Sequence, residues 1–243
     1  MRILIDARCL QEHPSLSQGI PLRDPRIRSE QSSTAANAPR GGVGVYTEQM
    51  IRAIIAYGNG EWRMANEELP EYILFVNGVR DPRRHLPDFD APNVRWIVGR
   101  WPNKLLNVMW MLGVGHWPFR ADVVWLPNLN FIPRLPRTTK LVVTVHDLSF
   151  EHFPDCFTLK QRLWHRLVQP RKLLARADAI IAVSATTKRD VVETYGIPEG
   201  KVHVVCPGID LPTPPRPPSQ WEVGKLPTIS PPAKTGGARG GLD

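Results

Sequence analysis

Short, almost continuously apolar runs recur along the chain and are separated by stretches with helical periodicity. Because these runs do not alternate between apolar and polar residues, we expect them to be β-strands buried on both faces, as in a parallel sheet. Seven runs have this character: 2–8, 72–77, 94–98, 122–127, 141–147, 179–184 and 202–207.

The intervening amphipathic stretches predict helices. One opens at Gly44 and can end at Gly58, and its apolar stripe comprises Tyr46, Met50, Ala53, Ile54 and Tyr57. Three more are predicted over 103–117, 158–176 and 185–195, the last with Ser184 as its N-cap. This alternation predicts the α/β class: a single Rossmann-like domain with a mostly parallel, doubly wound sheet.

Two segments lack this periodicity. Residues 11–40 are rich in Ser, Pro, Gln, Arg and Ala, and we expect a mobile insertion there. Residues 211–243 carry eight prolines and are expected to form a Pro/Gly-rich disordered tail. The domain should therefore span 1–210, with no second set of strands and helices after it.

The 243 residues carry a net charge of +8 with a pI near 9.8, which favours anionic partners such as phosphates or acidic lipid headgroups. No motif supports nucleic-acid binding, and we expect no nucleic acid among the partners. Cys9, Cys156 and Cys206 are far apart, which argues against a disulfide framework or a zinc site. Neither a signal peptide nor a membrane-spanning run is recognisable, so we expect a cytoplasmic protein.

The first segment with candidate chemistry is Gly41-Gly42-Val43-Gly44, which follows the insertion and opens a helix. Backbone N–H groups and the positive dipole end of a helix bind anions, and glycine allows a diphosphate to approach closely. A flexible loop end is the plain alternative. The G-x-G-x-x-G dinucleotide fingerprint is absent, because Thr47 stands where its last glycine would be.

A second segment places His146 and Asp147 at the end of a buried strand. Ligands of open α/β sheets bind outside the carboxyl ends of the strands. A histidine there can hydrogen-bond a substrate hydroxyl or a developing charge. Asp147 could orient His146 or cap the following turn.

Other residues suggest sites that we discount. Ser184 is first of all an N-cap. Asp88 and Asp90 form a D-x-D pair, but they lie in a proline-flanked loop. The set His146, Glu151, His152 and Asp155 has no metal-ligand spacing, so we expect no metal site.

Two segments combine apolar and basic residues in the manner of interfacial helices. They are 101–119, rich in Trp, Leu and Met, and 160–176, which has six Lys or Arg and no acidic residue. A core helix and a solvated face are the simpler interpretations of the two. Peripheral contact with the inner face of the membrane is the alternative that they raise.

Taken in order, several motifs resemble those of family 4 glycosyltransferases. The resemblance covers residues 1–10 and about 41–210. The similar segments are 3–8, 42–47, 143–148, 153–154, 177–184, 195–196, 201–202 and 207–210.

This resemblance implies the GT-B fold, in which two Rossmann-like domains face a cleft. The N-terminal domain mainly receives the acceptor, and the C-terminal domain mainly binds the nucleotide-sugar. Transfer would retain the anomeric configuration, with no metal and no cofactor other than the nucleotide-sugar substrate. The acceptor would be a glycan, such as a growing polysaccharide, or a lipid-linked sugar.

The resemblance also assigns roles to residues. His146 and Asp147 would be catalytic, with His146 contacting the transferred sugar. The donor diphosphate and the acceptor would lie beside Gly42, Val43 and Gly44. The candidates for lining the cleft are Arg8, Tyr46 and Ser184.

The chain departs from the family in two ways. The insertion 11–40 separates the first strand from its glycine loop, and 211–243 cannot replace a donor-binding domain of roughly 150 residues. We therefore expect the acceptor-side domain only, from a truncated, frameshifted or split gene, with little or no transferase activity by itself. The donor-binding domain would be a separate partner, and segment 146–148 suggests a hexosyl, specifically mannosyl, donor.

Two other functions remain open. The domain could be a non-catalytic module that binds a carbohydrate, a lipid or a partner protein. It could also be a different Rossmann-type protein that binds a nucleotide through its glycine loop, although the missing fingerprint argues against this.

Overall fold

A computed structural model of the chain describes residues 1–11, 41–60, 68–79, 82, 86–89, 91–115 and 120–208. All of these except Gly208 belong to one compact unit, Met1–Pro207. The expected insertion 11–40, apart from Gln11, and the expected tail 211–243 lie outside the described residues. The domain boundaries therefore stay predictions.

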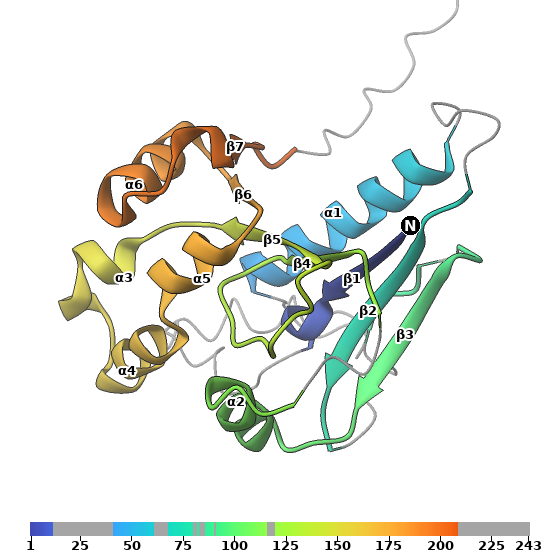
Figure 1. Ribbon diagram of the computed structural model, residues 1–243, viewed down its shortest axis with the longest axis horizontal. Helices are drawn as coiled ribbons and strands as arrows, with labels where there is room; N and C mark the ends of the chain where they lie inside the picture. The colour runs from blue at the N-terminus through green and yellow to red at the C-terminus, as the bar shows by residue number, and fades with distance from the viewer. Residues whose placement is uncertain are drawn as a thin grey trace, which may run out of the picture. The chain divides into compact units, whose positions relative to one another are not determined.

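A seven-stranded sheet forms the centre of this unit (Figure 1), and all its strand pairings are parallel. The strands lie in the order β3-β2-β1-β4-β5-β6-β7. The α/β, doubly wound prediction is confirmed, and the sheet is wholly rather than mostly parallel. The strands are β1 Arg2–Asp6, β2 Glu71–Asn77, β3 Val94–Gly99, β4 Val123–Leu126, β5 Lys140–Val145, β6 Ala179–Ala182 and β7 Val202–Val204.

Helices and short 3-10 turns connect the strands. The α-helices are α1 Gly42–Asn59, α2 Asn103–Met111, α3 Ser149–His152, α4 Leu159–Val168, α5 Pro170–Arg176 and α6 Ala185–Tyr195. The 3-10 turns are η1 Ala7–Leu10, η4 Pro154–Cys156 and η5 Glu199–Lys201. Ser184 caps α6 by accepting from the Thr187 amide, as predicted.

Two predicted helices differ from the structure. The expected helix 158–176 is two helices, because Gln169 adopts a left-handed conformation (φ 53°) and Pro170 starts a new helix without an N–H to donate. The expected helix 103–117 ends at Met111. Gly113 (φ 69°) and Gly115 (φ 89°) then hold conformations that a continuing helix cannot contain.

Two hydrophobic clusters flank the sheet, and successive residues of β1 enter different clusters. Ile5 packs in one cluster with Ile51 and Ile55 of α1. Leu4 packs in the other, which also contains buried residues of α2, α4, α5 and α6. This division follows from the alternation of side chains along a strand.

The strand order reverses beside β1, because β2 lies on one side of it and β4 on the other. Six of the strands thus have the order 3-2-1-4-5-6. Proteins with this strand order bind their ligands at the carboxyl edge of the sheet, near the point of reversal. β1 and β4 are hydrogen-bonded neighbours, and β4 pairs in turn with β5. The predicted site residues at the ends of β1 and β5 therefore lie on the same edge of the sheet.

Candidate functional site

The aromatic ring of Tyr46, in the second turn of α1, contacts the ring of His146, which follows β5. The two ring centroids are 4.8 Å apart and the ring planes are nearly perpendicular, at 85°. Edge-to-face contact of this kind is favourable for aromatic rings. The structure thus brings together two predicted motifs that are separated by 100 positions in the sequence.

Hydrogen bonds hold His146 at both its ring and its backbone. Its Nε2 lies 2.9 Å from the carbonyl oxygen of Pro127, just after β4. Because a carbonyl can only accept, Nε2 carries the proton and donates it. No described residue hydrogen-bonds to Nδ1, which is left as an acceptor on this half-buried side chain.

Thr187, in the first turn of α6, anchors the backbone of His146. Its hydroxyl donates to the His146 carbonyl oxygen at 3.1 Å. The hydroxyl of Ser184 therefore donates to Thr187 Oγ1, 2.9 Å away, while Ser184 Oγ accepts from the Thr187 amide at 3.0 Å. Ser184, a predicted cleft-lining residue, is thus an N-cap whose partner holds His146.

Asp147 is exposed and caps the turn that begins α3. One of its carboxylate oxygens accepts from the Ser149 amide at 2.9 Å and from the Ser149 hydroxyl. Of the two roles considered from the sequence, the structure thus places Asp147 in the turn cap.

The start of α1 is the segment that the sequence predicts to bind an anion. Gly41 is its N-cap and provides no side-chain hydrogen bond, while the first N–H groups of any helix lack intrahelical partners. A methyl group added at Gly41 or Gly42 would meet no described atom within 4 Å. Glycine here leaves open space beside the helix start.

The α1 helix packs directly against the end of β1, although 11–40 intervene in sequence. The thiol of Cys9, in η1, donates to Thr47 Oγ1 at 3.1 Å, and the Thr47 hydroxyl donates to the Val43 carbonyl at 2.8 Å. Burial raises the pKa of the Cys9 thiol to about 12. The glycine segment therefore keeps its expected place after the first strand.

The hydroxyl oxygen of Tyr46 is buried and has no hydrogen-bond partner among the described residues. Burial raises the pKa of this phenol. The Thr144 hydroxyl is near enough to lower this raised pKa in part. It accepts a hydrogen bond from Trp125 Nε1, however, and forms no well-aligned hydrogen bond with the Tyr46 hydroxyl.

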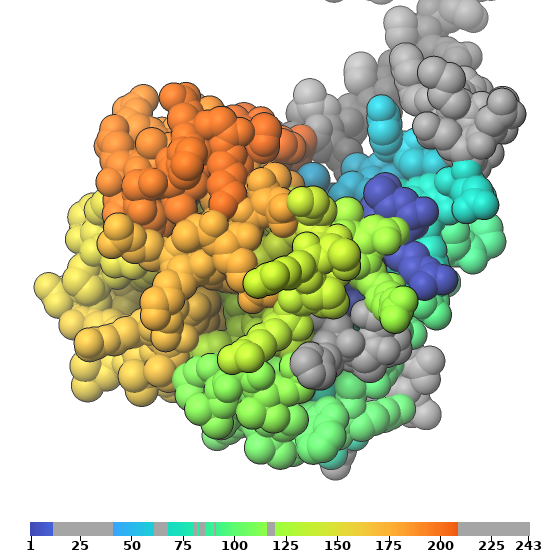
Figure 2. All heavy atoms as spheres, in the orientation of Figure 1, coloured from blue at the N-terminus to red at the C-terminus, as the bar shows by residue number. Residues whose placement is uncertain are grey.

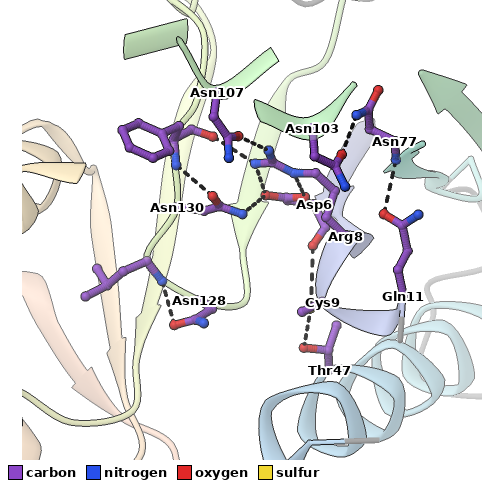
Figure 3. Close-up of polar contacts among 12 residues, drawn as sticks. Asp6, Arg8, Cys9, Gln11, Thr47, Asn77, Asn103, Asn107, Asn128 and Asn130 are labelled. Carbon is purple, nitrogen blue, oxygen red and sulfur yellow. Dashed lines mark hydrogen bonds and ion pairs between the residues drawn. The ribbon is translucent and has the colours of Figure 1, made fainter. Parts of the chain in front are cut away.

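Arg8, the third predicted cleft-lining residue, is buried in an ion pair at the end of β1 (Figure 3). Its Nε donates to Asp6 Oδ1 at 2.7 Å and its Nη2 to Asp6 Oδ2 at 2.6 Å. Only 8% of Arg8 and 3% of Asp6 are exposed. Arg8 also donates to the Phe131 carbonyl and lies over the Trp110 ring, 4.6 Å from its centroid. Arg8 therefore organises the loops after β1 and β4.

Asparagine side chains surround this ion pair, and sequence reasoning missed them. Asn107 accepts from Arg8 Nη1 (3.3 Å), and Asn130 donates to Asp6 Oδ2 (3.4 Å). Asn77, at the end of β2, donates to the Trp101 carbonyl and to Asn103 Oδ1, which fixes the entry into α2. One sequence signal could have located such a residue: an asparagine at the end of a buried apolar run, as at Asn77.

Apart from His146, the residues of the discounted metal set have separate partners. Glu151 accepts from the Tyr195 hydroxyl at 2.7 Å, His152 pairs with Asp190 at 2.5 Å, and Asp155 pairs with Arg162 at 2.9 Å. Asp90 lies outside the described residues. Within the described part of the chain, no three His, Cys, Asp or Glu side chains converge on a common point.

The fold and site together define a Rossmann-like domain in which the first turns of α1 lie beside a histidine that follows a central strand. A model of the family named Glycosyltransferase Family 4 matches residues 40–212. The chain belongs to this family, as its motifs indicated. No curated protein matches the chain.

Proposed function

We propose that this domain forms the acceptor side of a retaining glycosyltransferase. A sugar would pass from a nucleotide-sugar to a hydroxyl of a glycan or of a lipid-linked acceptor. The bond from the anomeric carbon to the donor phosphate breaks, a bond to the acceptor oxygen forms, and the hydroxyl proton leaves with the phosphate. The contact between Tyr46 and His146 carries this proposal, because it joins the glycine segment and the strand-end histidine in one site.

Each part of the site has a role in such a transfer. The start of α1 offers the N–H groups of Gly42 and Val43, together with a positive dipole end, to the donor diphosphate, while Gly44 donates its N–H to the Gly41 carbonyl. His146 keeps Nε2 on the Pro127 carbonyl, so Nδ1 is the atom that meets a sugar hydroxyl. Since Asp147 is committed to the turn of α3, it contributes by fixing the segment that follows His146.

The proposal includes a separate donor-binding domain, without which the chain transfers no sugar. The nucleotide-sugar is then a substrate, and the transfer needs neither a metal nor a further cofactor. The first donor to test is a hexosyl donor, specifically a mannosyl one. A cytoplasmic location at the inner face of the membrane suits a lipid-linked acceptor.

A transfer assay tests this proposal. The chain is incubated with labelled nucleotide-sugars and with glycan or lipid-linked acceptors, first alone and then with the donor-binding domain of a family member, added or fused. We expect transfer only in the second case. Turnover by the chain alone would remove the dependence on a second domain. Acceptor binding without transfer in either case would favour the non-catalytic module.

Two variants with matched controls test the residue roles. We expect His146→Ala to lower transfer by roughly 10²–10⁴-fold, whereas His203→Ala, on an exposed position of β7, leaves it unchanged. Gly42→Ala should fold normally but bind the donor more weakly, because the added methyl enters the space that we propose for the donor diphosphate. Gly200→Ala, where a methyl also meets no described atom, is its control.

A further inference from the structure

An apolar stripe faces solvent along α4. Three leucines follow one another at four-residue spacing. The exposed fraction is 82% for Leu159, 56% for Leu163 and 38% for Leu167. At 100° per residue they form one face of the helix, while Val168 on the opposite face is buried in the core. Exposed, aligned leucines of this kind mark an interaction surface.

Positive charge surrounds the leucine stripe. By helical geometry Lys160 borders it on one side and Arg166 on the other, and both are exposed. Between Cys156 and Ala177 the chain carries no Asp or Glu, and its six basic residues are Lys160, Arg162, Arg166, Arg171, Lys172 and Arg176. Within the described residues, Arg162 forms an ion pair with Asp155, which lies outside this interval.

We infer that this face of α4 docks on an anionic lipid bilayer. An apolar stripe between cations is the arrangement of an interfacial helix: leucines enter the acyl boundary, and long basic side chains reach the headgroups. A second copy of the chain would instead bring two sets of cations together. The helix α2 also exposes Leu105, Val108 and Met111, but it contains only Lys104 as a cation, so the charge pattern singles out α4.

The position of α4 relates this surface to the candidate site. The helix belongs to the segment that leaves the carboxyl end of β5, where His146 lies, and it forms the lower left margin of the domain in Figure 1, drawn in yellow to orange in Figure 2. Docking through α4 would bring a membrane-borne acceptor to that edge of the sheet. Only this last step rests on the proposed function. No helix in the described ranges has the length and apolar character needed to cross a membrane.

Vesicle flotation tests the docking surface without donor or acceptor. The full chain is mixed with vesicles of phosphatidylcholine alone, or of phosphatidylcholine with phosphatidylglycerol, at low and high salt. We expect binding to the anionic vesicles, weak binding to the neutral ones, and a loss of binding as salt screens the charges.

Substitutions on α4 separate the apolar and charge contributions. We expect Leu159→Ser and Leu163→Ser each to weaken binding about tenfold, because each removes a side chain that would enter the bilayer. Lys160→Gln and Arg166→Gln should each weaken binding about fivefold, and only to anionic vesicles. Leu69→Ser is the matched control, since Leu69 is 43% exposed but precedes β2, at the amino-terminal edge of the sheet.

Three outcomes would overturn the inference. The first is a wild-type chain that does not bind anionic vesicles, and the second is a leucine variant that binds as well as the wild type with unchanged circular dichroism. The third is a chain that ignores vesicles but dimerises, with Leu163→Ser restoring the monomer in sedimentation, which would assign the stripe to a second copy. Because no transfer is measured, failure of the proposed function leaves these readouts unaffected.

Discussion

Tyr46 and His146 contact each other edge to face across the junction between the first turns of α1 and the end of β5. One ring belongs to the segment that follows the glycines, and the other ends a central strand. Because the two rings are in contact, we expect a change at α1 to move the histidine that we place beside the transferred sugar. Several consequences of this coupling can be measured.

The hydroxyl of Tyr46 allows the contact to be dissected. Since this buried oxygen has no partner among the described residues, we expect Tyr46→Phe to leave the free energy of unfolding unchanged or raise it by up to about 1 kcal/mol. Tyr46→Ala removes the ring itself and should lower it by about 2–4 kcal/mol. Urea denaturation measures both. If Tyr46→Phe abolishes acceptor binding while the fold gains stability, the hydroxyl contacts the ligand.

Thr187 provides a second test of how His146 is held. Thr187→Val removes the hydroxyl that donates to the His146 carbonyl, and we expect a loss of about 1–2 kcal/mol in the free energy of unfolding. The imidazole NMR signals of His146 should shift, whereas those of exposed His203 should not. Thr187→Ser keeps the hydroxyl and should restore both. Unmoved His146 signals in Thr187→Val would show that α6 does not position the ring.

The ion pair of Asp6 and Arg8 should contribute to stability rather than to ligand binding. Arg8→Ala leaves the Asp6 carboxylate buried without its main partner, for which we expect a loss of about 3–5 kcal/mol. The double variant Asp6→Asn, Arg8→Met removes both charges and should lose less. A loss below about 1 kcal/mol for Arg8→Ala, accompanied by weaker acceptor binding, would instead support a role for Arg8 in lining the cleft.

Local patterns were sufficient to predict the sheet. The apolar runs located all seven strands, because buried parallel strands need apolar residues on both faces. The end of α6 was equally visible, since Gly196 adopts the left-handed C-cap conformation (φ 67°) that glycine favours. The break at Gln169 was not, because a non-glycine residue in that conformation carries no distinctive signal.

Most of the site depends on contacts between distant segments, which a single sequence does not reveal. The sequence suggested that Arg8 lines the cleft but did not reveal its partners, because two of them, Asn107 and the Phe131 carbonyl, lie 99 and 123 positions away. The pairing of Tyr46 with His146 likewise depends on how α1 packs over the sheet. Motif order suggested that both residues belong to one site, but only the fold determines which atoms meet.

The thiol of Cys9 provides a prediction about alkaline stability. Its pKa is raised from 9.0 to about 12 in the folded domain, mainly by burial. The folded state therefore keeps this proton at pH values where the unfolded chain releases it. The contribution of the thiol to the free energy of unfolding is complete below pH 9 and is lost as the pH rises towards 12. We expect the free energy of unfolding to fall by about 1 kcal/mol between roughly pH 9 and 10, measured by urea denaturation.

Cys9→Ala isolates this contribution. The phenols of Tyr46, Tyr72 and Tyr195 also have raised pKa values, but their ordinary value is 10.0, so they contribute mainly above the interval between pH 9 and 10, in which the Cys9 thiol of the unfolded chain ionises. The variant should therefore show a shallower decline between pH 9 and 10 and keep the steeper one above it. A thiol reagent gives an independent measure, because Cys156 and Cys206 are exposed while Cys9 should react about 10²–10³-fold more slowly until the domain unfolds. Rapid modification of all three thiols in the folded chain would contradict the partly buried, protonated state of Cys9.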